Sequence, residues 1–182
     1  MERGTREAVT VGRAGGVLLL CLLLFACDEA PPPPHVRVGQ PLPALSLVSL
    51  ENRPRTLEPV AGKLLMINVW ATWCAPCRHE MPSLQRLADQ LGPERFELVG
   101  ISVDSDEHLV REFLIERKIR FPSLLDRNLA MASGVLGLRV FPSSFFVRPD
   151  GSVARVVEGW REWDSPEMVR EIQALLPVEP GL

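Results

Sequence analysis

The stretch KLLMINVWATWCAPCRHEMP, residues 63–82, joins an apolar run to a pair of cysteines. Its first part, residues 63–70, is almost continuously apolar and of strand length, which is typical of a strand buried on both faces. A helix is expected from about Cys74 to Leu91, because apolar residues then recur at spacings of three and four and a Gly-Pro pair ends the pattern. Cys74 and Cys77 are therefore expected where a buried strand passes into a helix.

Strands and helices alternate along the rest of the chain. The expected elements are a hairpin around residues 44–55, a buried strand over 96–104, a helix over 106–117, a shorter helical stretch over 128–136, an antiparallel hairpin over 143–160 and a closing helix over 165–176. In the helix over 106–117, Leu109, Val110, Phe113 and Leu114 are expected on the inner face. These units predict an α/β fold, a mixed central sheet with helices on both faces.

Composition places the chain among ordinary globular proteins. Of its 182 residues, 46% are hydrophobic and 24% are charged, which is enough for one domain with a proper core. The net charge is -3 and the pI about 5.7. We therefore expect no binding of nucleic acid, because such proteins usually carry a basic surface.

The N-terminus resembles a bacterial lipoprotein signal. Three arginines precede an apolar run of ten residues, Val17 to Ala26, which is too short to span a membrane and suits a signal peptide. The run ends in LFAC, which resembles the lipobox, so residues 1–26 are expected to be removed and Cys27 to carry lipid. The alternatives are an ordinary secretory signal and an uncleaved anchor. Residues 27–38 read as a lipid anchor and a stiff Pro-rich linker, followed by a domain over 39–178.

Of the four cysteines, Cys21 lies in the expected signal peptide and Cys27 is the expected lipid site, which leaves Cys74 and Cys77. This pair allows four kinds of site. Covalent haem needs a histidine directly after the second cysteine, and Arg78 stands there instead. Structural zinc needs four ligands, usually from two such pairs, and the chain has one pair. A structural disulfide over two intervening residues would constrain the unfolded chain very little. We therefore expect no metal and no cofactor, and favour a dithiol that is oxidised and reduced.

The position of the pair supports redox chemistry. Free amide groups and the helix dipole at a helix N-terminus stabilise a thiolate, and the thiolate is the form that attacks disulfides. Pro76 fits the first turn of a helix, where its missing N–H costs nothing. Cys74 is expected to attack, and Cys77, one turn later, to resolve the mixed disulfide.

Several motifs together resemble the thioredoxin-like superfamily, and more closely its extracytoplasmic TlpA/ResA-type thiol-disulfide oxidoreductases. These are NVW before and EMP after WCAPC, the lead-in GQPLPAL, the VGISVD strand with an extra strand-helix insertion around residues 96–121, and VFPSSFFV before PDG. The resemblance covers residues 39–176. It implies a thioredoxin-like fold and a redox-active Cys74–Cys77 disulfide.

The resemblance also implies roles for further residues. Phe141 and Pro142 match the cis-proline loop that faces the redox pair and binds substrate, and Trp73 would form part of the apolar rim around the nucleophile. Thioredoxins carry a buried aspartate where this chain has Asn68. Glu80 is the expected replacement, a partly buried carboxylate with a raised pKa that relays a proton to or from Cys77. The alternative is a solvated helix glutamate.

The expected function is the reduction of disulfides in envelope proteins, such as apocytochrome c, by a monomer anchored to the bacterial membrane, on the periplasmic side of the inner membrane. A membrane electron donor of the CcdA/DsbD type would restore the dithiol. Disulfide oxidase or isomerase activity is one alternative, and a non-catalytic binding lipoprotein is another. A peroxiredoxin-like protein is a third, but it needs a threonine and a proline where this chain has Ala71 and Ile67.

Overall fold

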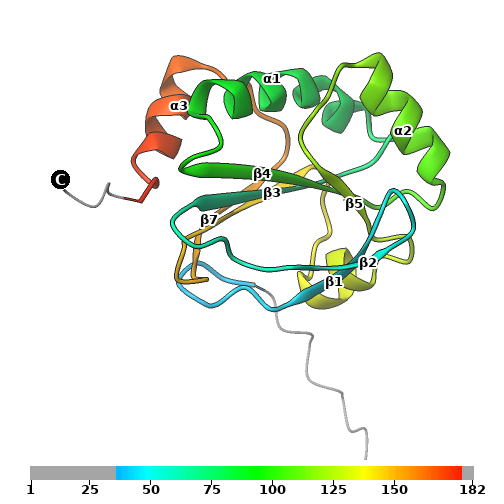
Figure 1. Cartoon of the computed structure of the whole chain (residues 1–182), viewed down its shortest axis with the longest axis horizontal. Helices are drawn as coiled ribbons and strands as arrows, with labels where there is room; N and C mark the ends of the chain where they lie inside the picture. Colours follow the sequence, from blue (N-terminus) through cyan, green and yellow to red (C-terminus); the bar gives the residue numbers. More distant parts are fainter. Residues whose placement is uncertain (1–35, 178–182) are drawn as a thin grey trace, which may run out of the picture. The chain divides into compact units, whose positions relative to one another are not determined.

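The computed structural model describes residues 36–177, whose strands form one seven-stranded mixed sheet (Figure 1). The proposed signal peptide, Cys27 and most of the Pro-rich linker lie outside the described residues. Strand β3, Leu64–Trp70, has all seven side chains buried, as its apolar sequence predicts. It pairs in parallel with β4, Phe96–Ser102, and antiparallel with β6, Ser143–Val147. The strand order is β2-β1-β5-β4-β3-β6-β7, with β1 at Leu45–Ser49, β2 at Pro54–Leu57, β5 at Ser123–Leu125 and β7 at Val153–Glu158.

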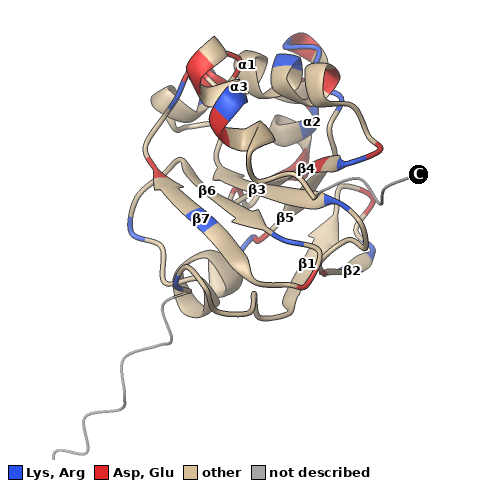
Figure 2. Ribbon diagram, turned by 90° about the vertical axis from the view of Figure 1, so that its left-hand side faces the viewer, with Lys and Arg blue, Asp and Glu red and all other residues tan. Residues whose placement is uncertain are grey.

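Helices cover both faces of the sheet. Helices α1, Ala75–Leu91, α2, Glu107–Glu116, and α3, Pro166–Gln173, lie together on one side. The short π-helix η2, Ala130–Val135, lies on the other side near β1 (Figures 1 and 2). The predicted fold class is confirmed. The three-residue strand β5 was not predicted, because so short a segment carries too few residues for a periodic pattern.

The helices bury the stripes that their apolar spacing predicts, with one exception. In α1, whose predicted stripe is Met81, Leu84, Ala88 and Leu91, the first two are fully buried and the last two half-buried. The prediction that Leu109 of α2 faces inward is wrong, because 51% of the residue is exposed. Residues 110, 113 and 114 of α2 are buried and form the inner stripe. Leu109 lies about 100° around the helix from residue 110, at the solvent edge of that stripe.

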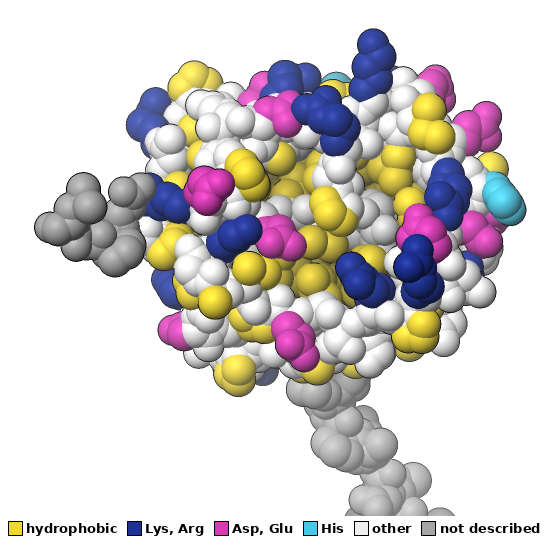
Figure 3. All heavy atoms as spheres, viewed as in Figure 1, with side chains coloured by type: hydrophobic (Ala, Val, Ile, Leu, Met, Phe, Trp, Pro, Cys, Tyr) yellow, Lys and Arg dark blue, Asp and Glu magenta, His cyan; other side chains and the backbone are white. Residues whose placement is uncertain are grey.

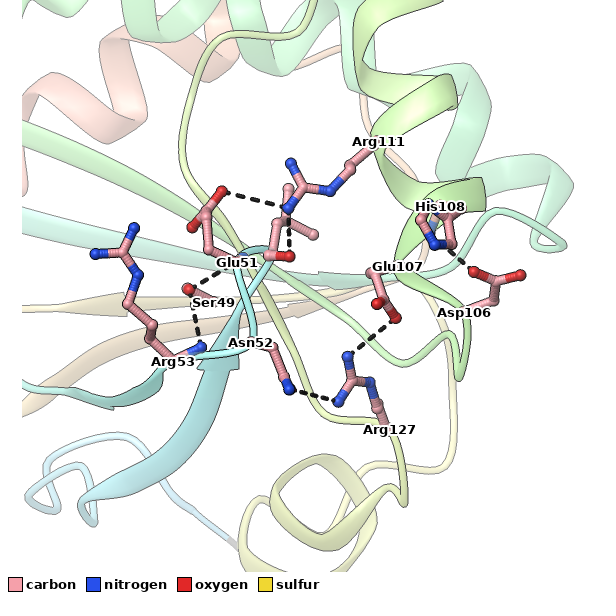
Figure 4. A network of polar contacts seen from close by, with 10 residues as sticks. Ser49, Glu51, Asn52, Arg53, Asp106, Glu107, His108, Arg111 and Arg127 are labelled. Carbon is pink, nitrogen blue, oxygen red and sulfur yellow. Dashed lines mark hydrogen bonds and ion pairs between the residues drawn. The ribbon is translucent and has the colours of Figure 1, made fainter.

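Ion pairs and a hydrogen bond connect the β1–β2 turn, α2 and the loop after β5 (Figure 4). Arg111 pairs with Glu51 at 3.5 Å, and Arg127 pairs with Glu107 at 3.0 Å while it also donates to Asn52 Oδ1 at 3.0 Å. Exposed pairs of this kind stabilise a fold by at most about 1 kcal/mol each, so the network mainly positions the turn. Over the face drawn in Figure 3, side chains of both charges are interspersed around apolar ones.

The described chain begins at the end of the sheet opposite the cysteine pair. The backbone N–H groups of Gly39 and Leu42 donate to Val153 and Gly151, in and just before β7. The β6–β7 turn follows Val147, which pairs with Leu65 near the start of β3. Cys74 lies beyond Trp70, the last residue of β3. None of the helices within residues 36–177 is long and apolar enough to cross a membrane.

Candidate active site

A disulfide joins Cys74 and Cys77 at the start of α1, with an S–S distance of 2.05 Å and Cα atoms 5.2 Å apart. Cys74 is the N-cap residue of the helix, and its Sγ accepts a hydrogen bond from the backbone N–H of Cys77 at 3.3 Å. An N–H aimed at this sulfur at a helix N-terminus favours its thiolate form once the disulfide is reduced. Cys74 is 6% exposed and Cys77 is fully buried, so Cys74 is the sulfur that a partner reaches first.

Of the three residues expected to bind substrate, Phe141 and Pro142 lie in the loop before β6. The Phe141–Pro142 peptide bond is cis, as the resemblance implies. Trp73, next to the disulfide in sequence, is 64% exposed, and its ring meets that of Phe141 edge-on with centroids 6.1 Å apart. Two aromatic rings from distant parts of the chain thus meet, and one of them is adjacent to Cys74 in sequence.

Glu80 is buried on the inner face of α1 and is only 1% exposed. Its Oε1 accepts a hydrogen bond from the Asn68 amide at 2.7 Å, and its Oε2 accepts from the Trp163 indole N–H at 2.9 Å and the Arg161 backbone N–H at 3.1 Å. Burial raises the pKa of Glu80 to about 7, although the three donors act in the opposite direction. The alternative of a solvated glutamate is therefore wrong, and the carboxyl group can hold or release a proton near neutral pH.

Sequence reasoning missed Trp163, whose contact with Glu80 joins residues 83 positions apart. It also missed Asp104, the last residue of the VGISVD motif. The Asp104 carboxylate accepts hydrogen bonds from the backbone N–H of Thr72 at 2.9 Å, the hydroxyl of Thr72 at 2.6 Å and the hydroxyl of Ser102 at 2.7 Å. Asp104 therefore holds the loop that leads from β3 to the disulfide. The motif was the available signal, but it did not indicate this contact.

Other features of the domain lie apart from this chemistry. His79 is exposed, and its ring meets that of Trp160 edge-on with centroids 5.0 Å apart. Within residues 36–177, no three histidine, cysteine or acidic side chains gather closely enough to hold a metal ion. A groove of about 540 Å³, lined by side chains that include Leu114, Ile119 and Phe121, lies near the start of β5 and contains none of the candidate site residues.

The comparisons with known proteins agree with this geometry. The sequence profile of the AhpC/TSA family matches residues 38–156. The chain is 34% identical over 127 residues to the thiol-disulfide oxidoreductase ResA of Oceanobacillus iheyensis, which covers 68% of this chain and 66% of that protein. It is 29% identical over 124 residues to ResA of Geobacillus thermodenitrificans, covering 68% and 71%.

Solved structures have the same fold. A thioredoxin family thiol:disulfide interchange protein of Chlorobium tepidum is similar with a TM-score of 0.61 and 26% identity, covering 76% of this chain and 98% of that one. The MTB dsbF structure, in mixed oxidised and reduced forms, is similar with a TM-score of 0.62 and 28% identity, covering 72% and 94%.

Proposed function

Since the chain belongs to the AhpC/TSA family and its fold is thioredoxin-like, we propose that it reduces disulfides in proteins outside the cytoplasm. Its curated relatives are thiol-disulfide oxidoreductases, and the chain is an enzyme of that class. The observation that carries the proposal is the Cys74–Cys77 disulfide at the N-terminus of α1, in which Cys74 keeps 6% exposure and Cys77 is fully buried.

The reaction has two exchange steps. The Cys74 thiolate attacks one sulfur of the substrate disulfide, the substrate S–S bond breaks, and the leaving substrate sulfur takes a proton. Cys77 then loses its proton, for which the ionised Glu80 is the acceptor, and attacks Sγ of Cys74. The mixed disulfide breaks, the second substrate sulfur leaves as a thiol, and the Cys74–Cys77 disulfide forms. The two cysteines lose two electrons and the substrate gains them. Of the two protons that the substrate takes up, one is equivalent to the proton that Cys77 gives to Glu80, and the other comes from solvent in place of the proton that Cys74 lost on ionisation.

Glu80 is suited to the second step because it is the titratable group of the buried cluster beside Cys77. It lies three residues after Cys77, a spacing that places both side chains on one face of α1. Its pKa of about 7 means that both forms are populated at neutral pH. The carboxylate can therefore take a proton from Cys77 during oxidation and return it during reduction.

The residues between the cysteines favour the reducing direction. Ala75 and Pro76 offer no positive charge to stabilise the reduced thiolate. Stabilisation of that form is what makes a dithiol pair strongly oxidising, so its absence favours a potential near that of thioredoxin. We expect the donor that restores the dithiol to be a membrane protein of the CcdA/DsbD type, and apocytochrome c to be among the substrates.

A lipid on Cys27 would keep the enzyme beside such a donor. The domain is joined to the preceding segment near Gly39, at the end of the sheet opposite Cys74. This arrangement supports a tether that leaves the disulfide accessible to large partners. The enzyme would act as a monomer on the periplasmic side of the inner membrane.

Peroxide reduction, as in a peroxiredoxin-like protein, is the alternative activity. A peroxidatic cysteine needs a threonine three residues before it and a proline seven before it. Here those positions hold Ala71 and Ile67, and both are fully buried apolar side chains. Disulfide exchange is therefore the better supported activity.

Turnover with a protein disulfide tests the proposal. The chain, supplied with a dithiol as electron donor, should accelerate reduction of an unfolded disulfide-containing protein, and Cys74→Ser should remove the acceleration. A rate equal to that of the dithiol alone would refute the proposal. Loss of hydrogen peroxide at a rate that depends on Cys74 would favour the peroxidase instead.

A further inference from the structure

We infer that Trp163 is a positioning residue for Glu80: its indole N–H fixes the carboxylate and directs the exchanged proton to one of its two oxygens. The inference deepens the proposed function and rests on it for the role of Glu80 in proton transfer. It concerns a residue of the loop between β7 and α3, far in sequence from the cysteine motif.

The side chain and the backbone of Trp163 are both held by contacts. The side chain is fully buried, and its ring packs against Phe146 of β6 with centroids 6.0 Å apart. Its backbone N–H donates to Ser83 Oγ at 3.2 Å, and that hydroxyl donates to the carbonyl oxygen of Glu80 at 2.8 Å. The indole and α1 therefore form a single hydrogen-bonded unit, in which Nε1 lies 2.9 Å from Glu80 Oε2.

The donors around Glu80 distinguish its two oxygens. Oε2 faces the indole N–H of Trp163 and the backbone N–H of Arg161, and neither group can accept a proton. Oε1 faces the side-chain amide of Asn68. The Oδ1 atom of that amide is buried and has no hydrogen-bond partner among the described residues. Rotation of the amide would present Oδ1 as an acceptor, so a proton on Oε1 can be bonded whereas a proton on Oε2 cannot.

Among the described residues, Arg161 is the charged group that acts on Glu80. The guanidinium of Arg161 favours the ionised form of Glu80, and Cys77 lies one turn earlier on α1. Asn68 of β3, which donates both to Glu80 and to Ser144 of β6, is neutral, as is Ser144. Removal of the indole N–H would therefore act on Glu80 directly, and the pKa of Glu80 would rise because its charged form loses a donor.

The contact can be tested first without any substitution. In the purified full chain in its oxidised form, the indole ¹H–¹⁵N resonance of Trp163 should shift with pH around a midpoint of about 7, together with the carboxyl ¹³C resonance of Glu80. Trp70 provides an internal control, because its indole is also fully buried but has no acceptor among the described residues. A Trp163 indole resonance that does not follow Glu80 would overturn the inference.

Two matched variants test the effect of the donor. Trp163→Phe should raise the Glu80 midpoint by about one pH unit, because a hydrogen bond to a charged group is lost. Trp70→Phe removes a buried indole N–H that does not contact Glu80, and it should leave the midpoint unchanged. If the Glu80 midpoint does not move in a folded Trp163→Phe variant, the inference is contradicted. If that variant does not fold, the wild-type titration described above decides the question.

These carboxyl titrations do not depend on catalysis. If Glu80 titrates together with Trp163 but Glu80→Gln has no effect on disulfide reduction, the role of Glu80 in the proposed function fails and the positioning contact stands. If Glu80→Gln slows disulfide reduction but Glu80 does not titrate together with Trp163, the proposed function stands and the positioning contact fails.

Discussion

The side-chain amide of Asn68 donates to Glu80 Oε1 at 2.7 Å, which joins the central strand β3 to helix α1 inside the core. Asn68 cannot titrate, so of this pair only Glu80 can exchange a proton. The proposed proton transfer at Cys77 therefore uses a residue of its own helix. That proposal, together with the greater exposure of Cys74 than of Cys77, leads to the following predictions.

Replacement of Glu80 by glutamine should slow disulfide reduction, because the shape is kept and the proton acceptor is lost. General acid–base catalysis typically contributes about 10²–10⁴-fold, and we expect at least about a tenfold loss near pH 7. The apparent pKa of at least one cysteine should fall, because a nearby negative charge is removed. The pH dependence of the reduction rate measures both effects.

Glu94→Gln is the matched control, since Glu94 is exposed just beyond the end of α1. It should leave the pH dependence unchanged. A profile for Glu80→Gln that coincides with the wild-type profile would show that Glu80 takes no part in the reaction.

Glu80 should also make the stability of the fold depend on pH. Its pKa is about 7 in the folded chain against an ordinary value of 4.5, so the folded state holds the proton more tightly. The resulting stabilisation is fully present below about pH 4.5 and is lost as pH rises to about 7 and above. At 1.36 kcal/mol per unit, the loss is on the order of 3 kcal/mol.

Glu80→Gln removes this dependence. Urea unfolding of the oxidised protein at pH 5 and pH 8 should show the variant gaining stability relative to wild type at the higher pH. An equal difference between the two proteins at both values would mean that Glu80 is not held in a protonated, buried state.

The two cysteines should behave differently when each is replaced by serine. Cys77→Ser should accumulate mixed disulfides with substrate proteins, because the sulfur that resolves them is gone. Cys74→Ser should accumulate almost none, because Cys77 is fully buried. Non-reducing electrophoresis after rapid acid quenching measures the trapped species. Similar trapping by both variants, or by neither, argues against Cys74 as the attacking residue.

Cys27 is predicted to attach the mature protein to the membrane. Cys27→Ser should leave unprocessed precursor or release the domain, because the lipid can no longer be added. Fractionation of cells that express each form, followed by mass determination, measures both outcomes. A variant that matures normally and stays with the membrane fraction would exclude the lipoprotein interpretation.

Much of the fold could be predicted because its signals are local. The apolar run of β3 and the apolar spacing of α1 each lie within one segment, and they place Cys74 at the junction of the two elements. Leu109 was misplaced because a stripe three to four residues wide has edges that spacing alone does not define. For Trp73 the resemblance, not the spacing, pointed to an exposed position, since tryptophan is common both in cores and at binding surfaces.

The environment of Glu80 could be predicted only in part. The sequence suggested a carboxylate close to Cys77, because that spacing is local to one helix. The partners of Glu80 come from positions 12 residues before it and 81 and 83 residues after it, namely Asn68, Arg161 and Trp163. Such contacts exist only once the sheet and the loop after β7 have assembled. No sequence pattern within one segment predicts these contacts.

The central claim, that Cys74 and Cys77 form a reducing dithiol, is tested most directly by a redox titration of the protein against glutathione and dithiothreitol. The account predicts one two-electron transition, absent from Cys74→Ser, with a midpoint close to the value of about -270 mV typical of thioredoxin. A midpoint near the value of about -120 mV found for strong oxidants such as DsbA, or no transition at all, would contradict it.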